Sequence, residues 1–218
     1  MRTLIFDLDG TLLDSKQSIL TSIDFALNEI GHKGLSYDKR QAVQQDLATT
    51  LKKTGDLLGI SFSEHQIASF IAIYRKHHST SPEKTMVAYE GVQDGLLELK
   101  KNFTLAVATT KHTAQAELIL QKLKLDHFFD HIQGTDSGMK YKPAPDILFH
   151  TLKMLGNSEA NLSAYIGDSV HDMAAAKAAG MRSVGAAYGF SGSEELKAIS
   201  PDHLIHEFKD LLSLFNNP

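Results

Sequence analysis

An apolar run that ends directly in acidic residues is the feature that most constrains the fold of this chain. Leu-Ile-Phe at positions 4–6 is followed by Asp-Leu-Asp-Gly-Thr-Leu at positions 7–12. Such a run, closed by glycine and small polar residues, predicts a buried strand that ends in a loop. Asp7 and Asp9 then lie at the carboxyl end of that strand, where two carboxylates resist joint ionisation. A bare Asp-x-Asp pair is often only a solvated strand end, whereas a bound metal ion would relieve the repulsion.

The composition excludes several classes of protein. With 42% hydrophobic and 22% charged residues, a chain of 218 residues is typical of a globular protein with a sizeable core. We expect a cytoplasmic protein without a membrane partner, because no apolar run reaches the roughly 20 residues that cross a bilayer and no signal peptide is recognisable. Zero cysteines exclude disulfides and thiolate chemistry. A net charge of -4 gives no basic footprint for nucleic acid.

Residues 15–82 show helical periodicity and no strand pattern. The spacing of their apolar residues predicts three helices, the second from about residue 36 to 54 and the third beginning at Ser63. We therefore predict a helical domain over residues 15–82 that is inserted after the first strand. The remaining residues, 1–14 and 83–218, are predicted to form the core domain.

After residue 82, strand and helix patterns alternate along the chain. Such alternation implies right-handed crossovers and a parallel sheet with helices on both faces. The predicted fold class is α/β, a doubly wound (Rossmann-like) parallel sheet core with an α-helical domain inserted after the first strand. Sheets of this kind bind ligands at the carboxyl ends of their strands, where the strand order reverses. The later strands are expected at residues 103–108, 131–133, 164–166 and 183–185, and the later helices at about 92–101, 113–123, 145–155 and up to 179.

Polar residues follow the predicted strands in four clusters. These are Asp7 with Asp9, Thr109-Thr110-Lys111, Lys142-Pro143, and Gly167-Asp168-Ser169 with Asp172. In this order they resemble the four motifs of the haloacid dehalogenase (HAD) superfamily of phosphotransferases. The resemblance covers about two thirds of the chain and implies that the clusters meet at one edge of the sheet.

The resemblance implies a role for each side chain of the first two motifs. Asp7 would be the nucleophile that becomes an aspartyl phosphate, and Asp9 would protonate the leaving oxygen and later activate water. Thr109 would donate a hydrogen bond to a phosphoryl oxygen, a role compatible with the helix N-cap that its position alone suggests. Thr110 stands where many members of the superfamily carry Asn, and its backbone N–H would face the anion.

Two lysines compete for the role of the third motif's lysine. Lys142 precedes Pro143 in Lys-Pro-Ala-Pro-Asp, which matches that motif, while Lys140 lies two residues before it. The adjacent proline favours Lys142, which would keep the nucleophile ionised and neutralise the phosphoryl group. We expect Lys140 and Lys111 to be solvated surface lysines.

The fourth motif implies a metal site. Asp168 would coordinate a hard divalent cation together with Asp7 and the backbone carbonyl of Asp9. Mg²⁺ is the expected cofactor, because it prefers carboxylate, carbonyl and water oxygens. Asp172 lies one helical turn later and would bind the metal directly or through water. Taken alone, the acids at 168 and 172 would be explained equally by a helix N-terminus.

The resemblance also narrows the reaction. Relatives that act as cation pumps carry Thr at the position of Asp9, and haloacid dehalogenases lack the Asp there, so Asp9 implies fast transfer to water or a sugar hydroxyl. The helical insert resembles the C1 cap of phosphoglycolate phosphatases, pyrophosphatases and β-phosphoglucomutases. A closing cap implies a small phosphorylated metabolite as the partner. The expected function is an Mg²⁺-dependent, phosphoglycolate phosphatase-like hydrolysis of a small phosphate monoester.

Other functions stay open at this point. An inorganic pyrophosphatase, a nucleotide phosphatase or a β-phosphoglucomutase-like phosphomutase would use the same motifs. A receiver-like phosphoacceptor domain shares the sheet and the acids, but it has no large helical insert behind the nucleophile strand. Conceivable substrate contacts in the insert, each equally explained as a solvated helix residue, are Lys52, Lys53, Tyr74 and Arg75. We expect a monomer or a weak homodimer.

Overall fold

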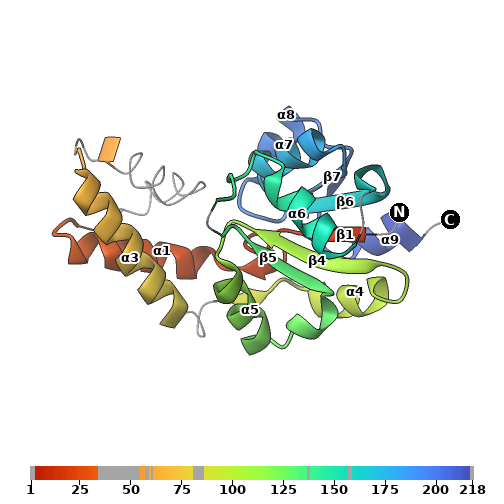
Figure 1. The fold of residues 1–218 in the computed structure, drawn as a ribbon, viewed down its shortest axis with the longest axis horizontal. Coiled ribbons are helices and arrows are strands. Elements are labelled where there is room, and N and C mark those ends of the chain that lie inside the picture. Colours follow the sequence, from red (N-terminus) through yellow and green to blue (C-terminus); the bar gives the residue numbers. More distant parts are fainter. Residues whose placement is uncertain are drawn as a thin grey trace. The chain divides into compact units, whose positions relative to one another are not determined.

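The computed structural model describes residues 3–33, 55–56, 59, 61–80, 86–136, 138–156 and 159–216, and the helix predicted at about 36–54 lies outside them. The contacts divide the chain into two units (Figure 1). One consists of Met1–Asp14 with Val87–Pro218, and the other of Ser15–Met86. The boundary predicted after residue 14 coincides with the first division, and the one predicted after residue 82 lies outside the described residues.

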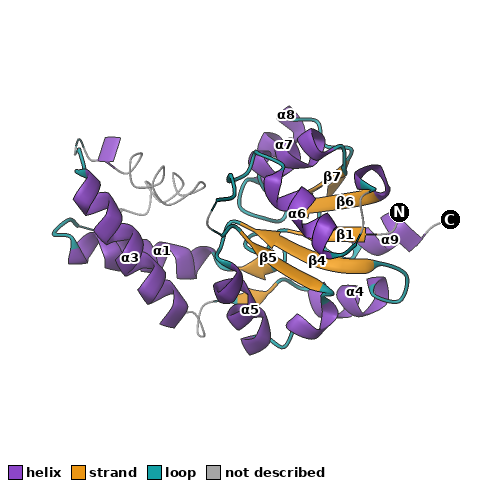
Figure 2. Ribbon diagram, viewed as in Figure 1, coloured by secondary structure: helices purple, strands orange, loops and turns teal. Residues whose placement is uncertain are grey.

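The first unit is built on a six-stranded parallel sheet, which confirms the predicted fold class. The strand order is β5-β4-β1-β6-β7-β8, so β1 is central and the order reverses beside it. The strands are β1 (Thr3–Phe6), β4 (Thr104–Thr109), β5 (His131–Gly134), β6 (Ser163–Gly167), β7 (Arg182–Ala186) and β8 (His203–Ile205). Helices lie on both faces of this sheet (Figure 2).

The central strand is buried on both faces, which explains why it reads as an uninterrupted apolar run. Successive side chains of a strand point to opposite faces. On one face Ile5 packs in a cluster with Tyr165 and with residues of α6 (Asp146–Met154) and α7 (Val170–Ala179). On the other face the ring of Phe6 stacks on that of Phe208, with 5.9 Å between their centroids.

Several short elements are not predicted by the sequence pattern. A two-residue antiparallel pair joins β2 (Leu13–Asp14) to β3 (Val87–Ala88). Such short segments contain too few residues to display a period. The same holds for β8 and for the two seven-residue helices near the C-terminus. The remaining elements of this unit are α4 (Val92–Leu99), α5 (Thr113–Lys122), η3 (Asp126–Phe128), η4 (Ala160–Leu162), α8 (Gly192–Ala198) and α9 (Asp210–Asn216).

The described part of the second unit is helical, as predicted. It contains α1 (Lys16–Glu29) and α3 (Glu64–Thr80), which pack on each other through Leu27, Phe70 and neighbouring apolar residues. A capping box opens α3 at the predicted start, because the backbone N–H of Ser63 donates to Gln66 Oε1 at 3.0 Å and the N–H of Gln66 donates to Ser63 Oγ at 3.3 Å.

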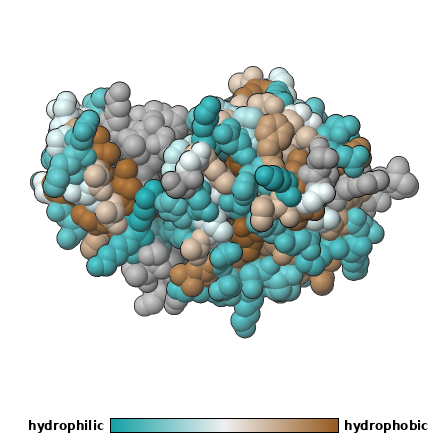
Figure 3. Space-filling model, in the orientation of Figure 1, coloured by the Kyte–Doolittle hydropathy of each residue, from teal (hydrophilic) through white to brown (hydrophobic). Residues whose placement is uncertain are grey.

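The described side chains on one face of the protein (Figure 3) are mostly polar. On the face drawn in Figure 3, hydrophilic residues predominate among the described ones, and hydrophobic residues form small separate patches. Isolated exposed apolar residues are normal on globular proteins and need no special explanation. Within the described residues, no helix has the length and apolar character that spanning a membrane requires.

Candidate active site

The polar clusters meet at the carboxyl edge of the sheet because three adjacent parallel strands end there. β1 lies between β4 and β6 and pairs with both in parallel. The backbone N–H of Asp7 extends this ladder by donating to the carbonyl of Ile166 at 2.8 Å. Residues that follow β1, β4 and β6 are therefore neighbours in space, as the sequence predicts.

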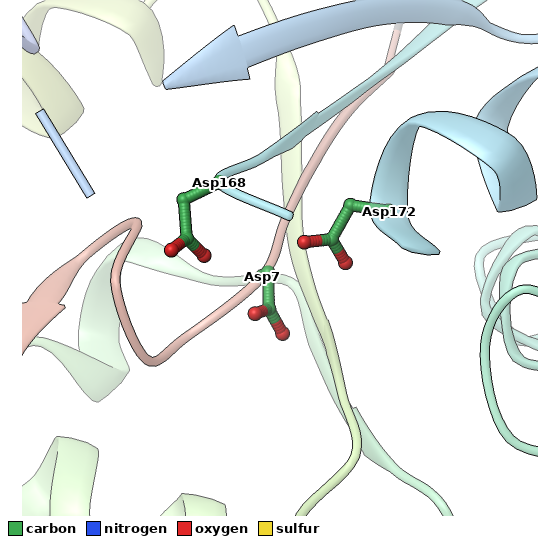
Figure 4. Close-up of side chains that lie close together, drawn as sticks. All are labelled: Asp7, Asp168 and Asp172. Carbon is green, nitrogen blue, oxygen red and sulfur yellow. The ribbon is translucent and has the colours of Figure 1, made fainter. Parts of the chain in front are cut away.

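Asp7, Asp168 and Asp172 form a buried acid cluster. Each offers a carboxylate oxygen, and these three atoms all lie within 4.8 Å of one another. Figure 4 shows the three side chains close together, at the ends of β1 and β6 and at the start of α7. Their exposed fractions are only 8%, 3% and 1%. Three carboxylates that are this close together and this deeply buried need nearby cations to remain ionised.

Lys142 supplies one cation to this cluster. Its Nζ atom lies 2.9 Å from Asp7 Oδ1 and 2.6 Å from Asp172 Oδ1. Burial alone would lower the pKa of Lys142, but the charges of Asp172 and Asp7 outweigh it and raise the pKa well above the ordinary value. The ammonium is therefore charged at neutral pH. Lys140, the rival from the sequence, is exposed.

Asp172 is saturated by partners that the structure describes. Its Oδ1 accepts a hydrogen bond from Lys142 at 2.6 Å and lies 3.2 Å from the Tyr165 hydroxyl oxygen. Its Oδ2 accepts from the backbone N–H of Ser169 at 2.9 Å and from the Ser169 hydroxyl at 2.6 Å. Burial raises the pKa of Asp172, but Lys142 and Ser169 outweigh that effect and lower it. Asp172 is thus an anion fixed in place beside Lys142.

Asp7 and Asp168 lack this compensation. Burial raises the pKa of Asp7 to about 6 against the opposing pull of Lys142. Burial, Asp172 and Asp7 raise the pKa of Asp168 well above its ordinary value. Although Asp7 Oδ1 is close to Lys142, the angles make this contact an ion pair, and within the described residues this oxygen accepts no hydrogen bond of good geometry. One ammonium among three carboxylates leaves the site short of positive charge.

A loop after β7 completes the surroundings of Asp168 and is not predicted by the sequence. The backbone N–H of Phe190 donates to Asp168 Oδ2 at 2.7 Å, and the Thr11 hydroxyl donates to Oδ1 at 3.4 Å. Glycines allow this close approach, because a Cβ on Gly10 would overlap the Asp168 carboxylate and one on Gly189 would overlap the Asp168 Cβ. Gly189, which follows the predicted strand at 183–185, is the one residue in the sequence that could have indicated a close approach of this loop.

Asp9, the second acid of the first cluster, forms an ion pair with Lys111. Lys111 Nζ lies 2.6 Å from Asp9 Oδ2, and only 9% of the lysine side chain and 15% of the aspartate side chain are exposed. The expectation that Lys111 is a solvated surface lysine is therefore wrong. The Lys111 side chain lies against Asp9 at the end of β1 and not in solvent. Nothing in the pattern Thr-Thr-Lys indicates that direction.

The two threonines after β4 differ from each other. Thr109 is buried at the end of the strand, and its Oγ1 accepts a hydrogen bond from the backbone N–H of Lys111 at 3.4 Å. The N-cap interpretation of Thr109 is wrong, because α5 begins at Thr113 and its N-cap position is occupied by His112. Thr110 has an exposed side chain.

Tyr165 links three parts of the site from within the core. Its hydroxyl donates to the Ala108 carbonyl at 2.8 Å, accepts from Lys142 Nζ at 2.8 Å and lies 3.2 Å from Asp172 Oδ1. Ala108 immediately precedes Thr109, so the hydroxyl connects the end of β4 to the lysine and acid of the other clusters. No sequence motif pointed to Tyr165, because a tyrosine within an apolar strand reads as core.

We predict that Tyr165→Phe lowers the free energy of unfolding by about 1–3 kcal/mol, the cost of depriving buried polar groups of a hydrogen bond. Urea denaturation followed by circular dichroism measures this difference. Tyr141→Phe is the matched control, because 46% of Tyr141 is exposed, and it is expected to change stability by less than about 0.5 kcal/mol. Equal stability of Tyr165→Phe and the wild type would contradict the bridging role of the hydroxyl.

A doubly wound sheet with acids and a lysine at its carboxyl edge defines an α/β protein suited to chemistry on an anionic ligand. The family model described as haloacid dehalogenase-like hydrolase matches residues 4–186. The chain therefore belongs to the haloacid dehalogenase-like hydrolase family. This confirms the family predicted from the four motifs and the prediction that the protein is an enzyme.

Known proteins similar to this chain are named as phosphatases. A phosphoglycolate phosphatase from Pseudomonas fluorescens is 32% identical over 219 residues, which cover 97% of this chain and 78% of the relative. The pyrophosphatase PpaX from Bacillus mycoides is 30% identical over 217 residues, covering 99% and 97%. The crystal structure of a predicted phosphatase from Clostridium acetobutylicum has a TM-score of 0.88 and 27% identity, covering 100% of this chain and 99% of that one.

Proposed function

We propose that this protein is an Mg²⁺-dependent phosphatase that hydrolyses a small phosphate monoester through an aspartyl phosphate on Asp7. The observation that carries the proposal is the ion pair between Asp7 and Lys142 inside the buried acid cluster, at the point where the strand order reverses. A carboxylate held beside an ammonium is suited to nucleophilic attack on phosphorus. The phosphatase names of the similar proteins support it.

The donor set fits a magnesium ion. The carboxylates of Asp7 and Asp168 and the backbone carbonyl of Asp9 are the proposed ligands, all of them oxygen atoms. The raised pKa values of the two acids and the poorly hydrogen-bonded Asp7 Oδ1 fit a site that binds a cation. Asp172 is better explained as the partner that fixes Lys142, because both of its oxygens already accept hydrogen bonds. Bound Mg²⁺ would neutralise phosphoryl oxygens and so let an anionic nucleophile approach an anionic ester.

The residues divide the reaction between them. An oxygen of Asp7 attacks phosphorus, the bond from phosphorus to the ester oxygen breaks, and Asp9, in this step a protonated acid, gives its proton to that leaving oxygen. Asp9 then takes a proton from water, which attacks the phosphorus of the aspartyl phosphate and releases inorganic phosphate and the Asp7 carboxylate. Throughout, Lys142 and the Thr109 hydroxyl stabilise charge on the phosphoryl oxygens. The Thr110 backbone N–H is a further proposed donor.

Two substrate classes are favoured by specific observations. Phosphoglycolate is the first, from the similarity to a phosphoglycolate phosphatase, and inorganic pyrophosphate is the second, from the similarity to PpaX. A nucleotide phosphatase and a phosphomutase are less favoured, since no similar protein described above carries those names. We further propose that the helical unit Ser15–Met86 is a C1-type cap that sets the choice of a small metabolite. A monomer or weak homodimer in the cytoplasm is the proposed setting.

Metal dependence tests the proposal. We predict that the purified protein releases phosphate from p-nitrophenyl phosphate in the presence of Mg²⁺. Treatment with EDTA should abolish the activity and added Mg²⁺ should restore it, because Asp7 cannot approach the anionic ester without the cation. Phosphoglycolate and pyrophosphate assayed in parallel would rank the two substrate classes. Phosphate release that is unaffected by EDTA would contradict the metal site, and no release from any of the three compounds would contradict the phosphatase.

A further inference from the structure

Lys111 brings a second cation to the site, on a different acid from Lys142. Lys142 pairs with Asp7, the proposed nucleophile, whereas Lys111 pairs with Asp9 at 2.6 Å. In the proposed function, the Asp9 carboxylate faces the leaving oxygen. Lys111 therefore lies on the leaving-group side of the reacting phosphorus, and Lys142 on the nucleophile side.

The backbone that carries Lys111 is fixed on both sides. Its N–H donates to the Thr109 hydroxyl at 3.4 Å, and its carbonyl accepts from the N–H of Thr135 at 2.8 Å. Gly134 packs directly under this carbonyl, where a Cβ would overlap it. A lysine held in this way loses less conformational freedom when it binds a ligand than a lysine on a free loop would.

We propose that Lys111 selects substrates whose leaving group carries an anionic group close to the ester oxygen, such as a carboxylate or a second phosphate. An ammonium has three donors and can bridge the Asp9 carboxylate and an anionic oxygen of the substrate. With 9% of its side chain exposed, its charge is screened less than that of a surface lysine. The inference rests on the proposed function, because it uses Asp9 as the acid for the leaving group.

A purely local role for Lys111 makes a different prediction. If the ammonium only held Asp9 in place, its removal would slow alkyl phosphates by the same factor whatever the charge of their leaving groups, because each alkoxide leaving group needs the proton from Asp9. A substrate-binding role instead makes the loss depend on the charge of the leaving group. Two substrates that differ only in that charge therefore separate the two roles.

The test compares 2-phosphoglycolate with 2-hydroxyethyl phosphate, in which a neutral hydroxymethyl group replaces the carboxylate. We expect the wild type to favour 2-phosphoglycolate in kcat/KM. In Lys111→Met both values fall, but that preference should also shrink by about 10- to 100-fold, the factor that a hydrogen bond to a charged group contributes. Pyrophosphate is expected to lose as much as 2-phosphoglycolate.

Controls keep the outcomes distinct. Lys140→Met removes an exposed lysine that follows β5 and is expected to leave the preference unchanged, while Lys111→Gln repeats the test should the Met variant fail to fold. Equal losses on both substrates, or a wild type without a preference for the anionic one, would overturn the selection by Lys111 while leaving the phosphatase intact. Absence of turnover on both compounds and on p-nitrophenyl phosphate would overturn the phosphatase and this inference together.

Discussion

Asp7→Asn is expected to lower turnover by about 10⁴-fold or more, because the amide oxygen is a poor nucleophile and no neighbouring group replaces the lost attack. Phosphate release in the presence of saturating Mg²⁺ measures the loss. An aspartyl phosphate should also be undetectable by mass spectrometry of the acid-quenched variant. Turnover within a factor of ten of the wild type would show that the attacking group is a different one.

The fold of Asp7→Asn should persist in metal-free buffer and gain stability. Burial raises the pKa of Asp7 to about 6, so at pH 7 the carboxylate is ionised in the folded state at a higher free-energy cost than in the unfolded chain. A folded pKa above the unfolded one costs stability at every pH above the folded value, and that cost vanishes below the unfolded value. The neutral amide removes it, and thermal unfolding at pH 7.5 should show an equal or higher Tm.

Asp202→Asn is the matched control for this change. Asp202 precedes β8 at the opposite edge of the sheet and accepts hydrogen bonds from the backbone N–H of Ser183 at 2.8 Å and from its hydroxyl at 2.7 Å. These bonds lower the pKa of Asp202, so the same chemical change should reduce stability slightly here. Turnover should be unchanged, because no group of the acid cluster lies nearby.

Lys142→Met is expected to damage stability and activity together. Removal of the ammonium leaves Asp7 and Asp172 buried without their cation, and breaking a buried ion pair typically costs about 3–5 kcal/mol. Loss of charge stabilisation at the phosphoryl group should also lower kcat by about 10²- to 10³-fold. Urea denaturation in metal-free buffer and steady-state assays in Mg²⁺ measure the two effects.

The stability deficit of Lys142→Met should depend on pH. Without the lysine, both acids have folded pKa values raised above their unfolded ones, so the penalty is full at high pH and fades as they become protonated. We expect the deficit to be larger at pH 8 than at pH 5. Adding Asp172→Asn to the variant should recover stability but not turnover, while Lys140→Met should affect neither. A deficit independent of pH would mean that lost packing, rather than stranded charge, destabilises the variant.

The sheet and its acids could be predicted because their signals are local. A strand buried on both faces reads as an apolar run, and residues 4–6 and 105–108 are such runs. The acids that directly follow β1 and β6 cannot lie anywhere except at the carboxyl edge. Lys142 also follows from its neighbour Pro143, which matched a known motif. For these residues, position in the chain determines position in space.

Lys111 and the loop after β7 could not be predicted because their signals are not local. Lys111 reaches Asp9 only because its loop turns toward the end of β1, and a loop lysine is solvated by default. The N–H of Phe190 donates a hydrogen bond to Asp168, and a backbone N–H is present in almost every residue, so the sequence does not indicate which one makes this contact. Which side chain or N–H contacts Asp9 or Asp168 depends on how segments distant in the sequence pack together.

The central place of β1 bears on how the protein is made. The ribosome synthesises β1 before both of its neighbours in the sheet, because Thr3 pairs with Thr104 on one side and with Ser163 on the other. Until β4 and β6 have both been synthesised, this apolar segment has two unpaired edges, and unpaired strand edges can associate with other chains. Asp7 is therefore synthesised well before the segments that surround it in the folded protein, so a chain arrested before β6 would contain this acid without the rest of the site.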